Sequence, residues 1–136
     1  MKKVLECPCT EKQKQLFIET FLEMTNVIKL YHWNTKVYSI HKATDDLSVK
    51  LELNSDRFIE ILIGKCHRRL KNIQQRINLI DIKTTDSLKH KLFEYRGFLV
   101  DMNNILNKKS DTDLLSVRDE ILGDINQFLY FLTFDK

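Results

Sequence analysis

The architecture of the chain is set by the segment TTDSLKHKLFEYRGFLVDMNNIL, residues 84–106. Its apolar side chains recur at alternating intervals of four and three residues, which places them on one face of an α-helix. They are Leu88, Leu92, Tyr95, Leu99, Met102 and Leu106. This spacing is typical of the seam between helices in a bundle. The segment therefore predicts a long amphipathic helix that opens in TTDS and packs against other helices.

Hydrophobic spacing predicts three more helices. The first begins at Thr10, where TEKQ has the pattern of a capping box, and ends near Lys36. The second runs from about residue 42 to residue 65, and the fourth follows Ser110 as its N-cap. Residues 68–80 also have helical spacing, and they either extend the second helix or form a short helix of their own.

Composition agrees with an all-α fold. The 136 residues include only three glycines and one proline, so long stretches lack helix breakers. A length of 136 residues with 43% hydrophobic content fits one domain over residues 1–136. No apolar run approaches the ~20 residues of a membrane span, and MKKVLECPCT lacks the apolar segment of a signal peptide. We therefore expect a four-helix bundle in an intracellular protein that does not enter a membrane.

The chain has three cysteines, Cys7, Cys9 and Cys66. An odd number in an intracellular chain favours reduced thiols over a disulfide framework. The alternative is a zinc site in which the three thiolates and His67 are the ligands. Its Cys-x-Cys spacing is tighter than that of the usual zinc knuckle, so free thiols are the expected state.

The predicted second helix has two faces of different character. One face carries the apolar stripe of Leu47, Leu51, Phe58 and Leu62. The roughly opposite face carries the carboxylates of Asp45, Glu52, Asp56 and Glu60. Three aliphatic residues lie among these carboxylates: Val49, Ile59 and Ile63. Exposing such side chains to water is unfavourable, so a fully solvated face would not be expected to carry them. We therefore expect a second copy of the chain to cover this face, in a homo-oligomer that is at least a dimer.

Two histidines lie close to the carboxylates in sequence. His32 is near the end of the first predicted helix, and His41 is at the start of the second, across a short bend. Imidazole nitrogens combined with carboxylates suit iron, zinc or manganese. The pair Asp56 and Glu60, at spacing i, i+4, presents two oxygens from one helix face. The alternative explanation is that the histidines only cap helix ends and that the acidic residues only form a solvated helix face.

The stretch YHWNTKVYSIHKATDD, followed by SDRFIE, resembles the Dps-type mini-ferritins of the ferritin-like superfamily. That pattern has His-Trp-Asn at the end of the first helix, a second His after a bend, an Asp one turn later and then Asp-x-x-x-Glu. The matching positions here are His32, His41, Asp45, Asp56 and Glu60. The motif covers about 30 residues, and similar chains also occur in large viruses and phages.

The resemblance implies a ferritin-like four-helix bundle of up-down-down-up topology, with a crossover between helices two and three. It implies a ferroxidase that oxidises Fe(II) at a site shared by two subunits, with iron storage in a shell and protection from peroxide. His32, His41, Asp56 and Glu60 would be catalytic, and Asp45 would be a further metal ligand; zinc and manganese are alternative metals. The competing interpretation is a non-catalytic ferritin-like structural or assembly protein, in a virion for example.

The charge of the chain argues against strong DNA binding. The net charge is +3, and the N-terminus carries only Lys2 and Lys3. Arg68, Arg69, Lys71 and Arg76 form a basic stretch that either contacts phosphates or is solvated. We therefore expect weak or absent DNA binding. The resemblance implies a cytoplasmic or nucleoid-associated location, with a virion as the alternative.

Overall fold

The computed structural model describes residues 7–71 and 76–134, and this part of the chain contains helices and no strand. The helices are α1 (Glu11–Asn34), α2 (Tyr38–Cys66), α3 (Thr85–Asp101) and α4 (Thr112–Phe131), and a short 3-10 helix, η1 (Met102–Asn104), directly follows α3. The all-α, four-helix prediction is thus confirmed for the described residues.

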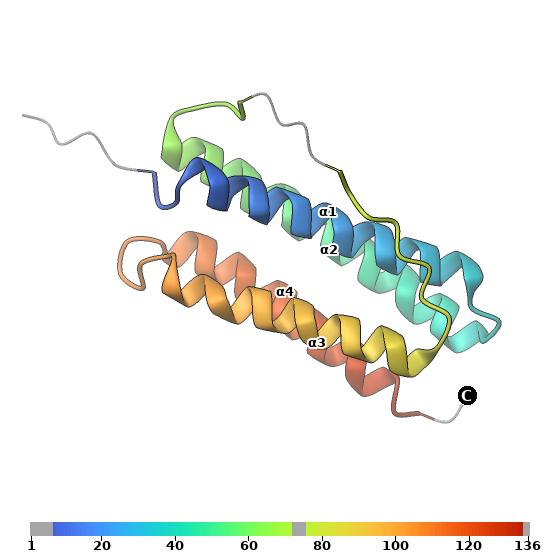
Figure 1. Ribbon diagram of the computed structural model, residues 1–136. Coiled ribbons are helices and arrows are strands. Elements are labelled where there is room, and N and C mark those ends of the chain that lie inside the picture. The colour runs from blue at the N-terminus through green and yellow to red at the C-terminus, as the bar shows by residue number, and fades with distance from the viewer. Residues whose placement is uncertain (1–6, 72–75, 135–136) are drawn as a thin grey trace, which may run out of the picture.

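The four α-helices form two packed hairpins (Figure 1). Residues 35–37 join α1 to α2, which runs back antiparallel to it. The connection from α2 to α3 returns along the length of the molecule, so α3 begins at the end of the bundle where α2 begins. As a result α2 and α3 run in the same direction, and α4 runs antiparallel to α3.

Local sequence explains where the helices begin and end. The capping box at Thr10 is confirmed: Gln13 N–H donates to Thr10 Oγ1, and Thr10 N–H donates to Gln13 Oε1. Thr84 caps α3 in a similar way, because its hydroxyl accepts from Ser87 N–H. The predicted cap of α4 is displaced by one residue, from Ser110 to Asp111.

The α1–α2 corner is tighter than the sequence suggested. Helix α1 ends at Asn34 and α2 begins at Tyr38, so only three residues separate them and the prediction of a start near residue 42 was wrong. At the other end, α2 stops at Cys66 because His67 has a left-handed backbone, with φ of 54°. The described residues between 67 and 84 contain no helix, and residues 72–75 of that segment lie outside the described part.

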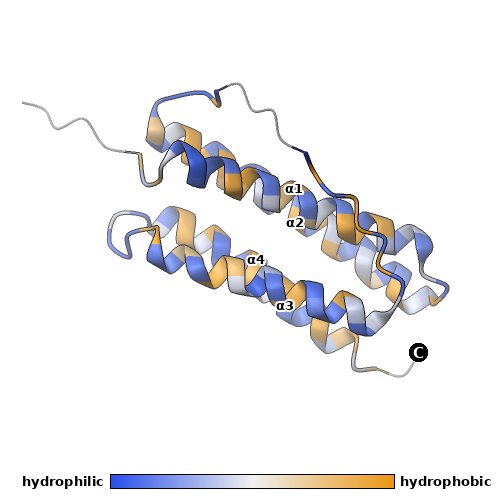
Figure 2. Ribbon diagram, viewed as in Figure 1, coloured by the Kyte–Doolittle hydropathy of each residue, from blue (hydrophilic) through white to orange (hydrophobic). Residues whose placement is uncertain are grey.

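The apolar stripes meet in one core between the helices (Figure 2). The six residues of the predicted seam, from Leu88 on α3 to Leu106 just after η1, are all buried. The four residues of the apolar stripe on α2 are buried as well. Four aromatic rings contact one another edge to face at its centre, with centroids 5.1–6.0 Å apart: Phe17, Phe21, Phe58 and Phe98. These contacts join α1, α2 and α3, and edge-to-face packing stabilises them beyond simple burial.

Charged side chains tie the helices together at the edge of this core. Lys65 of α2 donates to Ser110 O at 2.9 Å and pairs with Asp113 at 3.0 Å and Asp111 at 3.3 Å. Partial burial alone lowers the pKa of Lys65, but the two carboxylates outweigh it and the pKa is raised. Buried Arg118 of α4 donates to Leu99 O of α3 at 2.7 Å. The N-terminus of α4 and the C-terminal half of α3 are thereby fixed.

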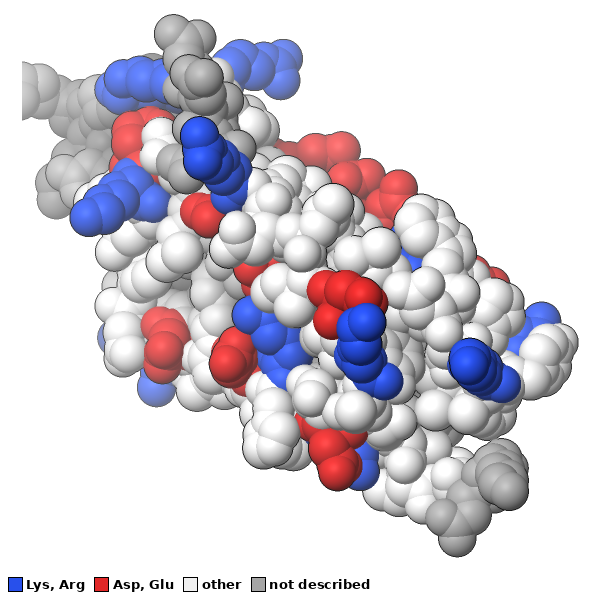
Figure 3. Space-filling model, turned by 45° about the vertical axis from the view of Figure 1, so that its right-hand side comes forward, with Lys and Arg blue, Asp and Glu red and all other residues white. Residues whose placement is uncertain are grey.

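On the face shown in Figure 3, charged side chains of both signs are interspersed, and positive ones are most numerous at one end of the molecule. Lys and Arg side chains gather there beside residues that the structure does not describe. Arg68, Arg69 and Lys71, just after α2, are exposed. The pKa of Glu11 is lowered by its hydrogen bond from Lys14 and by the nearby charges of Lys71 and Arg68. The start of α1 and the segment after α2 therefore share this basic end.

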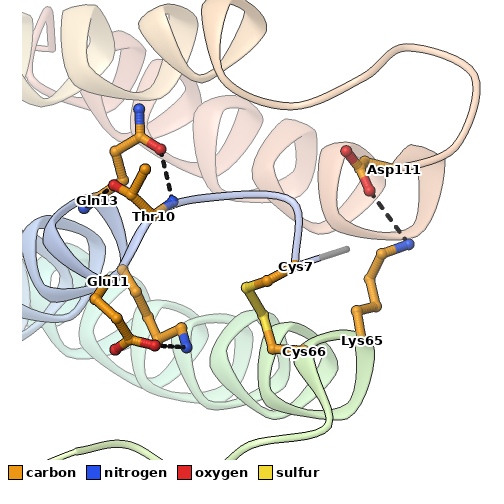
Figure 4. Close-up of a disulfide and its surroundings, with 8 residues drawn as sticks. Cys7, Thr10, Glu11, Gln13, Lys65, Cys66 and Asp111 are labelled. Carbon is orange, nitrogen blue, oxygen red and sulfur yellow. Dashed lines mark hydrogen bonds and ion pairs between the residues drawn. A yellow bond between two sulfur atoms is a disulfide. The ribbon is translucent and has the colours of Figure 1, made fainter. Parts of the chain in front are cut away.

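The same end of the bundle holds a disulfide between Cys7 and Cys66 (Figure 4). Antiparallel packing of α1 on α2 brings the segment before α1 to the last residue of α2, with Cα atoms 4.3 Å apart across 59 positions of sequence. The prediction of three reduced thiols was therefore wrong. The alternative zinc site is also excluded, because two of its thiolates are bonded to each other. Cys9 remains a free, buried thiol, and burial raises its pKa to about 11.

We predict that Cys7→Ser lowers the free energy of unfolding by up to about 4 kcal/mol, because the unfolded chain loses a constraint on a long loop. Thermal unfolding followed by circular dichroism would measure the change. Reductant should lower the midpoint of the parent to that of the variant and leave the variant itself unchanged. A parent insensitive to reductant would show that the disulfide contributes no stability.

Candidate metal centre

The three-residue corner brings His32 of α1 and His41 of α2 face to face. His32 Nδ1 lies 2.8 Å from the carbonyl oxygen of His41, and His41 Nδ1 lies 2.8 Å from the carbonyl oxygen of His32. The two residues therefore exchange a reciprocal pair of ring-to-backbone hydrogen bonds. We call this arrangement the histidine clasp.

The clasp stabilises a corner that would otherwise leave backbone groups without partners. His32 lies in the last turn of α1, where carbonyl groups have no intrahelical partner. The ring of His41 supplies the missing donor. In addition, the Thr35 hydroxyl accepts from Val37 N–H at 3.2 Å, so the three-residue connection is fixed from both sides.

The clasp also determines which nitrogen of each ring carries the proton. A carbonyl oxygen only accepts, so both Nδ1 atoms must be N–H donors. In a neutral imidazole the other nitrogen, Nε2, then keeps its lone pair. Neither Nε2 has a hydrogen-bond partner among residues 7–71 and 76–134, and both rings are only half-buried. A backbone acceptor on one nitrogen is the usual way in which a protein orients a histidine toward a metal.

The two rings are stacked, with centroids 3.9 Å apart and planes inclined by 16°. A metal ion bound to an imidazole nitrogen lies close to the plane of that ring, about 2.1 Å from the nitrogen. Nearly parallel planes do not meet at so short a distance. In the described arrangement, one ion cannot bind both Nε2 atoms at once.

The carboxylates predicted as ligands are exposed on α2. Asp45 lies one helical turn beyond His41, whereas Asp56 and Glu60 lie away from the histidines of their own chain. Asp45, Asp56 and Glu60 make no ion pair or hydrogen bond with the described residues. Asp56 is 15 residues beyond His41, which corresponds to about 22 Å along a helix. Accordingly, no group of three or more metal-ligating side chains occurs within the described part of a single chain.

An exposed apolar patch lies between the histidines and the distant carboxylates. On α2, Val49 is 61% exposed and Leu53 is 68% exposed. Trp33, next to His32, is 66% exposed. We refer to Val49 and Leu53, which are neighbours at spacing i, i+4 on α2, as the midpoint patch.

A protein-family model of unknown function, DUF5856, matches residues 32–132 of the chain. The match covers well over half of the sequence. The chain belongs to the DUF5856 family. All five candidate metal ligands lie within the matched region, which begins at His32. Comparison with curated proteins and with solved structures gives no match. Among the described residues of this DUF5856 protein, no helix is long and apolar enough to cross a membrane.

The prediction from sequence missed two features of this candidate site in the DUF5856 protein. The clasp depends on side chains that reach back across the corner, and only the spacing of two histidines across a three-residue turn hints at it. Thr44 was not considered either. It is fully buried, and its Oγ1 lies 3.2 Å from His32 Nδ1. Its position one turn after His41 could have suggested it.

We predict that His41→Phe destabilises the DUF5856 fold by about 1 kcal/mol, because the aromatic ring remains but the hydrogen bond to His32 O is lost. Chemical denaturation would measure the loss. His90→Phe is the matched control: His90 is exposed on α3 and its ring packs edge to face with that of Phe93, so stability should change little. Equal effects of the two substitutions would contradict a structural role for the clasp.

Proposed function

We propose that the protein is a Dps-like ferroxidase that binds and oxidises Fe(II) between two copies of the chain. The histidine clasp of one protomer would face Asp56 and Glu60 of the other, with Asp45 as a further ligand. The observation that carries this proposal is the clasp. In each ring, a backbone oxygen holds Nδ1 and so orients the lone pair of Nε2. Neither Nε2 has a hydrogen-bond partner among the described residues.

The position of the midpoint patch supports a two-fold dimer of this kind. The midpoint between His41 and Glu60 falls next to Leu51, and the midpoint between Asp45 and Asp56 falls at the same place. A two-fold axis there would place each histidine opposite the partner's carboxylates, because an isologous contact is self-complementary. Val49 and Leu53 flank that point, and an exposed apolar patch marks a surface that associates.

The stacked rings favour two iron ions over a single ion bound by both histidines. Each ring would bind its own ion, since one ion cannot lie in both ring planes. The carboxylates of the second chain would complete both coordination shells and offset the ionic charge. Two neighbouring Fe(II) ions supply two electrons, which is what the reduction of hydrogen peroxide to water requires. Dioxygen is the alternative oxidant.

The course of the chain agrees with a ferritin-like bundle. In Figure 1 the long connection between α2 and α3 makes these helices parallel, as an up-down-down-up topology requires. An ordinary ferritin would instead hold iron inside its bundle with Glu-x-x-His motifs, and no Glu in this chain is followed three residues later by His. Further association into a shell would allow storage of the oxidised iron. DNA binding at the basic end would be weak and sensitive to salt.

We predict that Leu53→Glu converts the parent dimer, or larger assembly, into a monomer. The change adds charge beside the symmetry-related copy of itself, and helicity should be unchanged because the side chain is exposed. Light scattering at micromolar concentration measures the mass. Val100→Glu on α3, where the side chain is 49% exposed, is the control that should keep the parent's mass. A monomeric parent would remove the intersubunit site.

We predict that Asp56→Asn slows Fe(II) oxidation by at least about tenfold, because it removes the charge of a ligand and keeps its shape. Absorbance of the Fe(III) product measures the rate, and circular dichroism should show unchanged helicity. Asp101→Asn is the control, since Asp101 is exposed at the end of α3 and outside the motif. If the parent does not oxidise iron, a structural or assembly role replaces the enzymatic one.

A further inference from the structure

We infer that Thr44 is a positioning residue for His32, which fixes the proton of that ring on Nδ1 and so presents Nε2 to a metal ion. This inference rests on the proposed function for its metal-binding consequence. The tautomer itself is a property of the metal-free chain. The evidence is the hydrogen bonding around one fully buried hydroxyl group on the second turn of α2.

The hydroxyl of Thr44 has only one proton, and backbone acceptors take it. Thr44 Oγ1 donates to Ile40 O at 2.8 Å and is 3.0 Å from His41 O. Both of these atoms are carbonyl oxygens, which cannot donate. The lone pairs of Oγ1 remain, and His32 Nδ1 lies 3.2 Å from that oxygen. While its proton is given to these carbonyl oxygens, Thr44 acts toward His32 as an acceptor.

Two acceptors therefore favour the Nδ1–H tautomer of His32, whereas one acceptor favours that tautomer of His41. The Nδ1–H of His32 faces His41 O and Thr44 Oγ1, and the Nδ1–H of His41 faces His32 O alone. If His32 carried its proton on Nε2 instead, the lone pair of Nδ1 would face His41 O, which has no proton, and Thr44 Oγ1, which could offer its proton only by giving up its hydrogen bond to Ile40 O. Since Thr44 is fully buried, water could not relieve that repulsion.

The position of Thr44 on the helix also fixes the ring in space. Thr44 is three residues after His41, so the two acceptors of His32 are presented by consecutive backbone turns of α2. The ring of His32, on α1, is held against α2 by both and is stacked on His41. Loss of Thr44 Oγ1 would allow the ring to rotate or to exchange its tautomer. Supports of this kind around a metal-binding histidine typically change affinity by about 10- to 100-fold.

The test compares Thr44→Val with the parent in two measurements. In the metal-free protein, long-range ¹H–¹⁵N NMR correlations report which nitrogen of His32 carries the proton. We expect Nδ1–H in the parent and a larger Nε2–H population in Thr44→Val, where His41 O is the remaining acceptor that favours Nδ1–H. In the second measurement, titration with Co(II) should show a dissociation constant raised by about 10- to 100-fold. Thr44→Ser keeps the hydroxyl and should restore both properties.

Thr25→Val is the matched control. The Thr25 hydroxyl donates to Phe21 O at 3.0 Å, one turn back on α1, as that of Thr44 does on α2, and it does not contact a histidine. It should alter neither the tautomer nor Co(II) binding. Thr44→Ala replaces Thr44→Val in both measurements if the valine variant does not fold.

The outcomes separate the two proposals. If His32 in Thr44→Val is entirely Nδ1–H and Co(II) binds as in the parent, the inference is overturned. It is also overturned if Thr44→Val only lowers thermal stability, because a purely structural role would do that. If the tautomer changes as expected but the parent does not bind Co(II), the role of Thr44 in orienting His32 stands and the ferroxidase proposal fails.

Discussion

The reciprocal hydrogen bonds between His32 and His41 are the interaction on which the site and the corner both depend. They satisfy a backbone carbonyl at the end of α1, they close a three-residue connection, and they set the height at which α1 and α2 pack. Once that height is fixed, Cys7 reaches Cys66 at the opposite end of the hairpin. The midpoint patch then lies halfway along α2. A single pair of side chains thus aligns the features that the proposed function uses.

Much of the fold could be predicted because hydrophobic spacing determines which helix face is buried. The seam from Leu88 to Leu106 and the stripe from Leu47 to Leu62 are buried as expected. The capping box at Thr10 was also predicted, since its two hydrogen bonds join residues three apart. Helix ends were less certain because they depend on single backbone conformations. His67, with its left-handed backbone, ends α2 before the helical spacing of the following residues could continue it.

The features that could not be predicted all depend on how helices pack on one another. The Cys7–Cys66 disulfide joins residues that become neighbours only when α1 lies antiparallel to α2. The usual association of intracellular proteins with reduced thiols gave the wrong expectation. The separation of the candidate ligands along α2 could be interpreted only once α2 was known to be one continuous helix. The contact between Thr44 and His32 requires the corner itself.

The length of α2 has a consequence for dimers that combine two different variants of the chain. His41 and the distant carboxylates lie on one helix, α2, and His32 of α1 is hydrogen-bonded to His41. Within one chain, the histidines are therefore too far from these carboxylates to bind the same ion. In a two-fold dimer, each chain would then give its histidines to one site and its carboxylates to the other. A chain without the histidines and a chain without the carboxylates would each be inactive alone. Paired together, they would rebuild one complete site and leave the other with neither set.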